Sequence, residues 1–447
     1  MSATAVDITK TPLESWIAER LVIPSHALTR EDIEQYQLTA LRQTVAWAHR
    51  YSSFYAQHFA DIPDDLPHSL SEISRFPFTS SKDIARHAPR FLCVSQDEIS
   101  RVVTMHTSGT SGAPKRLFFA EAEQESALDF FAHGVAAVVA PGDRMLIALP
   151  GEREGSVGYQ LAKGIARAGV IPIPHGLSAD LAHTLAHMEQ EKATCIIGLP
   201  VQMLALFADN SACADSVLHR LRFIVLCSDH VPESLVRRLR QRTGCEIFEH
   251  YGMTEMGLGG GVDCAAHMGY HLREADLYFE IVDPESGEPL PDGETGEIVF
   301  TTLQRIAMPL IRYRTGDLSR FLLGPCGCGT ILRRLDRVRN RIDGFVSLGI
   351  SGSISICALD EAVFDIPGLV DFTATLTQSR SRRLEIAVYA PGMGSAQIEA
   401  AVRDTLHILP VICHACNSGE VELRVISAQK PLSVTGAKRK IEVKAEQ

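Results

Sequence analysis

The sequence contains no apolar run that approaches the ~20 residues with which a helix spans a bilayer. Its first residues, MSATAVDITKTPLESW, lack the basic start and apolar stretch of a secretory signal, so we expect a cytoplasmic protein with no membrane partner. The chain has fewer positive than negative residues, with 43 Lys and Arg against 54 Asp and Glu, so its net charge is −11. Nucleic-acid backbones are bound by clustered excess Lys and Arg, so nucleic acid is not the expected partner.

A disulfide framework is not expected either. The 11 cysteines are odd in number, and most are scattered singly through apolar segments, as buried free thiols are. The remaining composition, 45% hydrophobic and 22% charged residues, is typical of a folded globular protein. At about 150 residues per domain, the length of 447 residues predicts two or three domains.

The pattern of apolar runs predicts an α/β protein. From about residue 144, the runs RMLIALP, ATCIIGLP and LRFIVLC alternate with segments long enough for helices, which favours a parallel sheet covered on both faces. One such helix is expected over residues 231–242, before Gly244. Later, DLYFEIVD and GEIVFTTL flank a turn-rich segment and predict an antiparallel, β-rich part. The last ~100 residues resemble a small α/β unit, and the Gly-rich DGFVSLGISGSIS beside it is expected to be a hinge.

The sharpest local motif is HTSGTSGAPK at residues 106–115. Small residues let backbone N–H groups approach phosphate oxygens closely, and the hydroxyls and Lys115 add further donors. The spacing is not that of a Walker loop. A flexible linker is the competing interpretation.

Four segments, in order, resemble the adenylate-forming (acyl-CoA synthetase) superfamily. They are the loop at 106–115, EHYGMTE at 249–255, RYRTGD at 312–317 and NRID at 340–343. SSFYAQHF, RFPFTSSKDI and VFTTLQRIAMPLIRYRTGD resemble the phenylacetate–CoA ligase branch. The resemblance implies a large N-terminal adenylation domain, residues 1–340, with parallel sheets flanked by helices and a β-rich subdomain. It also implies a small, mobile C-terminal α/β domain, residues 341–447.

The reaction that the resemblance implies is an ATP-dependent, AMP-forming ligation. A carboxylic acid, expected to be aromatic, attacks the α-phosphate of ATP and gives an acyl-adenylate and pyrophosphate; coenzyme A then displaces AMP. Such an in-line displacement needs positioning and charge stabilisation rather than a covalent nucleophile. The implied partners are therefore the small-molecule acid, ATP, Mg²⁺ and coenzyme A, and a homodimer is left open.

The resemblance also assigns an ATP site. Its residues are Thr107, Ser108, Gly109, Thr110, Ser111, Gly112, Lys115, Tyr251, Gly252, Thr254, Asp317 and Arg341. Tyr251 would stack on adenine, and Asp317 would accept hydrogen bonds from the ribose hydroxyls. Thr254 would contact the α-phosphate and Glu255 would hold Mg²⁺. The implied catalytic residues are Lys115, Thr254, Glu255 and Lys438.

The assignment near the C-terminus is the least regular. Lys438 in TGAKRK is the expected adenylation lysine and Lys440 the alternative, because the glycine and lysine that adjoin in the family are separated here. A solvated basic tail is the competing interpretation. Asp343 matches the family's hinge, where Asn340 replaces the usual glycine.

Four further residues are candidates for the acid pocket. Ser228 and Asp229 follow an apolar strand, at the carboxyl edge where open α/β sheets bind ligands. Tyr159 lies where the branch has an aromatic pocket segment. His250 is a weaker candidate, because a lone histidine is more often structural.

The cysteines and one histidine suggest a metal site. Cys326 and Cys328 share one tight turn, and Cys264 is followed seven positions later by His271. Three thiolates and one imidazole are the ligands of a closed tetrahedral zinc site. The pattern resembles that of some members of the phenylacetate–CoA ligase branch, which carry a structural zinc. His267 is the competing ligand, and unpaired loop cysteines are the alternative interpretation.

Two alternative functions stay open. YGMTEMGLGGG and GYHLREADLYFEIVDP also resemble synthetases that adenylylate a deazaflavin coenzyme without forming a thioester. The departures at Asn340 and around Lys438, with the run GISGSIS, suggest a catalytically inactive nucleotide-binding homologue.

Overall fold

The computed structural model describes residues 10–63, 65–105, 114–178, 180–208, 211–378, 382–430, 432 and 438–445. The chain divides into two compact units, each discontinuous in sequence. Unit 1 comprises Met1–Pro141, Arg153–Val170 and His250–Val338, and unit 2 comprises Gly142–Glu152, Ile171–Glu249 and Arg339–Gln447. In the part of the chain that the structure describes, no helix is long and apolar enough to cross a membrane.

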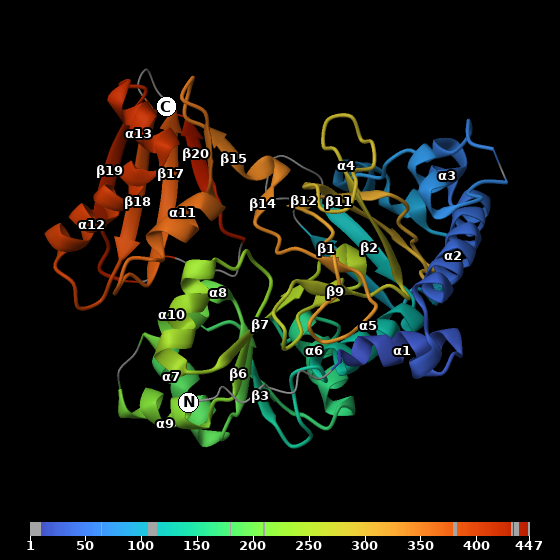
Figure 1. Ribbon diagram of the computed structural model, residues 1–447, viewed down its shortest axis with the longest axis horizontal. Coiled ribbons are helices and arrows are strands. Elements are labelled where there is room, and N and C mark those ends of the chain that lie inside the picture. The colour runs from blue at the N-terminus through green and yellow to red at the C-terminus, as the bar shows by residue number, and fades with distance from the viewer. Residues whose placement is uncertain are drawn as a thin grey trace. The chain divides into compact units, whose positions relative to one another are not determined.

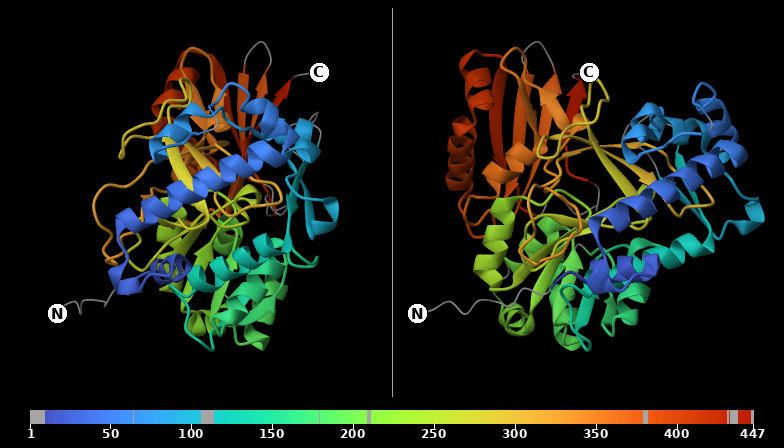
Figure 2. Two further views of the ribbon diagram at one scale, coloured as in Figure 1. Left: turned by 90° about the vertical axis from the view of Figure 1, so that its right-hand side faces the viewer. Right: turned by 45° about the vertical axis from the view of Figure 1, so that its right-hand side comes forward.

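The helices of unit 1 come mainly from the N-terminal third of the chain. They are α1 (Pro12–Leu21), α2 (Arg30–Tyr51), α3 (Ser53–His58), α4 (Ser81–His87), α5 (Glu121–Val135) and α6 (Val157–Arg167). The long helix α2, seen clearly in Figure 2, begins at a capping box in which Thr29 and Asp32 exchange hydrogen bonds. Its apolar face joins the buried core of unit 1.

The strands of unit 1 are antiparallel. They are β1 (Arg101–Met105) with β2 (Lys115–Phe119); β10 (Leu277–Val282), β11 (Gly296–Thr302) and β12 (Tyr313–Ser319); and the short β8 (Gly261–Val262), β9 (Tyr270–Leu272) and β13 (Arg334–Leu335). The expected antiparallel pairing of DLYFEIVD with GEIVFTTL is confirmed as β10 with β11.

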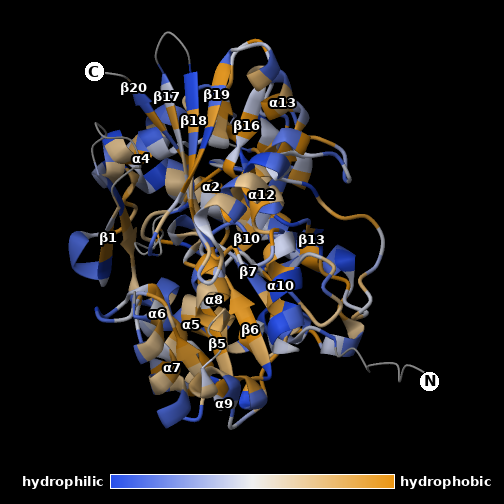
Figure 3. Cartoon of the chain, turned by 90° about the vertical axis from the view of Figure 1, so that its left-hand side faces the viewer, coloured by the Kyte–Doolittle hydropathy of each residue, from blue (hydrophilic) through white to orange (hydrophobic). Residues whose placement is uncertain are grey.

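Unit 2 contains the predicted parallel sheet. Its strands lie in the order β4 (Ile171–Pro174), β3 (Arg144–Ile147), β5 (Cys195–Gly198), β6 (Phe223–Leu226) and β7 (Glu246–Tyr251), whose last two residues belong to unit 1. Strands β5 and β6 are apolar throughout, as Figure 3 shows, because both faces are covered.

Helices α7 (Leu181–Gln190), α8 (Pro200–Phe207), α9 (Ala212–Arg220) and α10 (Glu233–Thr243) connect these strands. The helix expected over residues 231–242 is α10, which ends at Gly244 with φ 68°.

The C-terminal part of unit 2 is a second α/β layer. Its sheet has the order β19 (Val421–Ser427), β18 (Arg382–Tyr389), β17 (Asp371–Gln378) and β20 (Ile441–Ala445), and its helices are α11 (Ile356–Val363), α12 (Ser395–Ile408) and α13 (Pro410–Asn417), as Figure 1 shows. One buried core joins this layer to the parallel sheet of unit 2. The boundary at residues 340/341 stays a prediction.

The Gly-rich segment at residues 343–355 contains a β-hairpin, and its expected role as a hinge stays a prediction. Strand β15 (Phe345–Ser347) pairs with β16 (Ser353–Ser355). Gly349 and Gly352 have φ of 108° and 118°, and they form the turn between the two strands. Just before it lie β14 (Asn340–Arg341) and the turn Ile342–Gly344.

Candidate active site

Three motif side chains of unit 1 meet in one buried cluster. Lys115 begins β2, Glu255 lies in the 3₁₀ turn Thr254–Met256 after β7, and Tyr313 begins β12. The Lys115 ammonium contacts Glu255 Oε1, and the Tyr313 hydroxyl donates to the same oxygen at 2.9 Å. Lys115 is 8% exposed and Glu255 6% exposed. The lysine expected to bind phosphate and the carboxylate expected to bind Mg²⁺ are thus brought together.

The protonation of Glu255 follows from this contact. Burial opposes its ionisation, but the charge and hydrogen bond of Lys115, with the Tyr313 hydroxyl, outweigh burial and lower its pKa. Arg305 donates to the Glu255 carbonyl oxygen at 2.8 Å and so fixes the turn. Glu255 is therefore an ionised carboxylate held in place, a suitable hard ligand for a divalent cation.

A second pair of motif residues lies on the same unit. The Tyr251 hydroxyl donates to Asp317 Oδ2 at 3.0 Å, and the Tyr251 ring stacks on Tyr270 with centroids 5.8 Å apart. Gly252 follows directly, where a Cβ would lie 2.1 Å from the Leu258 carbonyl oxygen, so only glycine fits. Asp317 is 3% exposed. The residues expected at adenine and ribose are therefore neighbours.

Sequence reasoning missed Tyr313 and Arg305. Tyr313 stands in the RYRTGD segment, and in β12 it shares a buried face with Thr315 and Asp317. The two-residue period of a strand could have identified it. Arg305 carried no such signal, because its contact with the Glu255 turn depends on the tertiary fold.

The ATP-loop residues Thr107, Ser108, Gly109, Thr110, Ser111 and Gly112 lie outside the described residues. Thr254 is described and begins the turn that holds Glu255.

In unit 2, the loop after β6 is tied to the C-terminal strand. Ser228 has φ 72°, a left-handed conformation that is costly for a non-glycine residue. Asp229 accepts hydrogen bonds from the backbone N–H of His230 at 2.9 Å and of Arg439 at 3.0 Å. Burial raises the pKa of Asp229, while these two hydrogen bonds oppose the rise. Lys438, the expected adenylation lysine, is thus one residue from a contact with the expected acid-pocket loop.

Arg439 is the buried anchor of that segment, and the sequence did not reveal it. Its guanidinium lies 2.8 Å from Asp360 and 3.6 Å from Asp371, and it donates to the Phe372 carbonyl oxygen at 3.0 Å. Burial raises the pKa of Asp360 to about 6, although Arg439 opposes the rise. Lys438 and Lys440 are exposed on either side.

The remaining candidates are more scattered. The Tyr159 hydroxyl donates to Glu154 at 3.2 Å. His250 lies beside the rings of Phe130 and Phe131, and burial lowers its pKa to about 4, so it is neutral near pH 7. Arg341 contacts Asp343 at 3.2 Å on the surface.

The expected zinc ligands do come together. Cys264, His271, Cys326 and Cys328 are buried, and their ligand atoms all lie within 4.8 Å of one another. Cys264 Sγ is 3.7 Å from Cys326 Sγ, and His271 Nε2 is 3.3 Å from Cys264 Sγ and 3.5 Å from Cys328 Sγ. The competing ligand, His267, instead hydrogen-bonds Asp263 at 2.9 Å.

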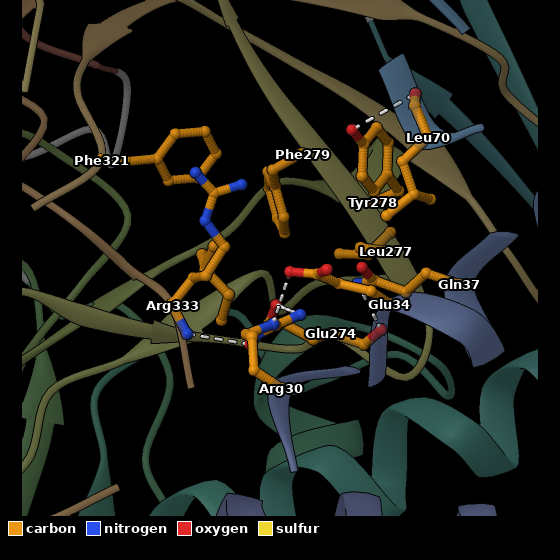
Figure 4. A pocket seen from close by; sticks show the side chains of 11 residues that line it. Arg30, Glu34, Gln37, Leu70, Glu274, Leu277, Tyr278, Phe279, Phe321 and Arg333 are labelled. Carbon is orange, nitrogen blue, oxygen red and sulfur yellow. Dashed lines mark hydrogen bonds and ion pairs between the residues drawn. The ribbon is translucent and has the colours of Figure 1, made fainter. Parts of the chain in front are cut away.

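A small, partly open pocket in unit 1 lies among other residues (Figure 4). Arg30 donates to Glu274 at 2.8 Å and to Glu34 at 3.2 Å, and the Arg333 backbone N–H donates to Glu274 at 2.9 Å. The charges of two arginines and two glutamates offset one another here, and none of the candidate ATP, acid-pocket or zinc residues is among the residues that line the pocket.

The chain matches the family model described as AMP-binding enzyme over residues 56–305. It is 28% identical over 442 residues to a phenylacetate–coenzyme A ligase of Pseudomonas putida, with 95% of each chain covered. A Thermus thermophilus phenylacetate–coenzyme A ligase is 28% identical, covering 71% of this chain and 72% of the relative. The fold is similar to that of a 2-hydroxyisobutyryl-CoA ligase in complex with 2-HIB-AMP, with a TM-score of 0.78, 20% identity, and 93% and 90% of the two chains covered.

These similarities confirm the expected α/β fold and the resemblance drawn from the four motifs. Together with the clustering of Lys115, Glu255, Tyr251 and Asp317 on one unit, they identify the chain as a member of the AMP-binding enzyme family, in its adenylate-forming, phenylacetate–CoA ligase-like branch.

Proposed function

We propose that the protein is an ATP-dependent acid–CoA ligase that forms an acyl-adenylate from an aromatic carboxylic acid and then an acyl-CoA thioester. The observation that carries the proposal is the buried contact of Lys115 with Glu255. A cation and an anion held together in a dry site can separate to bind a phosphate and a divalent cation, which are the two parts of MgATP. Tyr251 and Asp317 are the proposed contacts of adenine and ribose.

The roles of the site residues follow from their chemistry. Lys115 would supply positive charge to the phosphates. Glu255 would bind Mg²⁺, and Thr254 would contact the α-phosphate. Lys438 is the proposed adenylation lysine, because Asp229 holds the adjoining Arg439 backbone against the loop after β6. Lys440 lies on the far side of this anchor and stays the alternative. Asp343 is the proposed hinge.

An aromatic acid is proposed because four of the curated relatives are named phenylacetate–coenzyme A ligases and two are named feruloyl-CoA synthases. His250 adds support, since it is a neutral imidazole beside the rings of Phe130 and Phe131. Apolar rings with one polar group suit an aryl ligand.

Zinc is the metal that the thiol cluster fits best. Around a tetrahedral zinc with bonds of about 2.3 Å to sulfur and about 2.0 Å to nitrogen, sulfurs lie about 3.8 Å apart and sulfur lies about 3.5 Å from nitrogen. Here the sulfurs of Cys264 and Cys326 lie 3.7 Å apart, and His271 Nε2 lies 3.3 Å from Cys264 Sγ and 3.5 Å from Cys328 Sγ, while all four ligand atoms lie within 4.8 Å of one another. With four protein ligands the coordination is closed, so we propose a structural zinc that joins the loop of Cys264 to the turn of Cys326 and Cys328.

The coenzyme-adenylylating alternative is not favoured, because the curated relatives are named as CoA ligases. An inactive nucleotide-binding homologue remains the second outcome of the experiment. A cytoplasmic location, the lack of nucleic-acid and membrane partners, and a homodimer stay predictions from the sequence.

The experiment is pyrophosphate release with ATP and Mg²⁺ over a panel of aryl and short-chain acids, each with and without coenzyme A. Release that requires one aryl acid, with acyl-CoA formed when the thiol is present, is the expected result. Lys115→Met and Glu255→Gln are expected to abolish release, and the exposed Lys444→Met serves as a charge-matched control. Release without thioester formation would overturn the ligase assignment, and no release despite ATP binding would favour the binding-only homologue.

A further inference from the structure

Three histidine rings gather in unit 2, where strand β4 ends and helix α7 begins. His175 follows β4, and His183 and His187 lie one turn apart on α7. The ring centroids are 5.5 Å apart for His175 and His183, 5.1 Å for His175 and His187, and 6.2 Å for the helical pair. The proposed ligase reaction uses none of them. Two histidines four residues apart on one helix are also the spacing with which helices bind metal ions.

Two of the ring nitrogens already converge. His175 Nδ1 lies 2.9 Å from His187 Nδ1. The other nitrogen of His175, Nε2, lies 2.9 Å from the hydroxyl oxygen of Thr184. That hydroxyl donates its single proton to the Asp180 carbonyl oxygen at 3.0 Å, so it accepts a hydrogen bond from His175 Nε2–H. Neutral His175 therefore keeps its lone pair on Nδ1, facing His187.

This arrangement is the one that orients a metal-binding histidine. The nitrogen that does not bind the metal donates to a fixed acceptor, and the lone pair of the other nitrogen then points into the site. Thr184 is 4% exposed and is the fixed acceptor for His175. Burial, with His187 and His183 nearby, lowers the pKa of His175 and so favours its neutral form.

The distances also indicate the kind of ion. With metal–nitrogen bonds of about 2.0 Å, two nitrogens lie about 2.8 Å apart at a right angle and about 3.3 Å apart in a tetrahedron. The 2.9 Å separation matches the right angle, which is the preference of Cu²⁺ and Ni²⁺. Rings bound to one ion have centres about 4.5–6.4 Å apart, given about 3.2 Å from metal to ring centre. All three centroid distances fall within that range.

We propose that His175, His183 and His187 bind one divalent copper or nickel ion, with the converging Nδ1 atoms of His175 and His187 as neighbouring ligands. His183 is exposed, so its side chain can turn to bring a nitrogen to the ion. The site would join the segment after β4 to helix α7, and it is separate from the proposed Cys264 zinc site in both ligands and geometry.

The test uses the full-length protein titrated separately with Cu²⁺, Ni²⁺ and Zn²⁺. With the proposed Cys264 site already filled with zinc, we expect one equivalent of Cu²⁺ whose pulsed EPR spectrum shows imidazole nitrogen coupling, and weaker binding of Zn²⁺ at the three histidines. His187→Ala and the exposed His183→Ala should each weaken Cu²⁺ binding at least about tenfold. The matched control is His219→Ala, an exposed histidine on α9, which should bind as the wild type does.

Two results would overturn the proposal. Equal Cu²⁺ affinity in wild type, His183→Ala and His187→Ala would show that the 2.9 Å contact is only a hydrogen bond between two rings. An EPR spectrum without imidazole coupling would place the copper elsewhere. Because His183 is exposed, its variant keeps the test valid even if His187→Ala fails to fold.

Discussion

Replacing Asp229 by alanine should impair the first half of the proposed reaction and spare the second. Asp229 accepts two backbone hydrogen bonds, one of them from Arg439 beside Lys438. Hydrogen bonds to a charged group contribute about 1.5–3 kcal/mol each, and their loss leaves the Arg439 N–H without this acceptor. If this contact positions Lys438 for adenylation, the rate of adenylation at saturating acid should fall about 10- to 100-fold in Asp229→Ala.

The assay separates the half-reactions. Acid-dependent exchange of pyrophosphate into ATP reports adenylation, and conversion of a pre-formed acyl-adenylate with coenzyme A reports thioester formation. Asp229→Asn should lie between wild type and Asp229→Ala, because its amide keeps one accepting oxygen. Asp365→Ala removes an exposed carboxylate of the same unit that pairs with Arg237, and it should change neither half-reaction.

The result that refutes the reasoning is an equal loss in both half-reactions, which would indicate general misfolding, or no loss in either. A rise in the KM for the acid with kcat unchanged would instead assign Asp229 to the acid pocket. Thermal unfolding of each variant controls for the fold.

Three more outcomes are expected. Cys328→Ser should lose most of about one bound zinc by metal analysis and lower the unfolding temperature, whereas retained zinc would contradict the proposed ligand set. Arg439→Met leaves Asp360 buried without its cation and should cost about 3–5 kcal/mol in the free energy of unfolding at pH 7 by urea titration. The pKa of Asp360 in the folded protein, about 6, is raised above its unfolded value, so its contribution to stability is present at low pH and is lost as the pH rises from about 4 to 6. The loss of unfolding free energy in Arg439→Met should therefore become smaller when the pH is lowered. Tyr313→Phe removes a hydrogen bond to Glu255, should raise the pKa of that carboxyl, and should shift the Mg²⁺ dependence of pyrophosphate release to higher pH; an unchanged profile would exclude this role.

The sequence was most informative where local chemistry decides the structure. Apolar runs such as FIVL in β6 cannot face water on either side, so they predicted buried parallel strands. Gly244 after α10 has the positive φ that stops a helix. The glycines 349 and 352 were less informative, because the same freedom of φ serves a flexible linker and a tight hairpin turn equally well.

The site was predictable only in part, because tertiary packing selects among equivalent residues. His267 and His271 follow Cys264 at three and seven positions, and spacing alone could not separate them. Strand β9 places His271 at the thiols, while His267 lies in the preceding loop and meets Asp263. Arg439 stands between two lysines, and only the fold shows that its side chain is the least exposed of the three.

If Lys115 and Glu255 have the proposed roles, their contact predicts that the nucleotide and the metal ion bind together. A phosphate without its metal would draw Lys115 away and leave the Glu255 carboxylate unbalanced in a buried place, and a metal without phosphate would leave Lys115 unbalanced. An uncompensated buried charge costs several kcal/mol, so either ligand alone should bind poorly. Binding of the two together neutralises both charges. Under the proposed roles, the ion pair therefore predicts positive cooperativity between nucleotide and metal binding, because only the two ligands together keep the charges balanced.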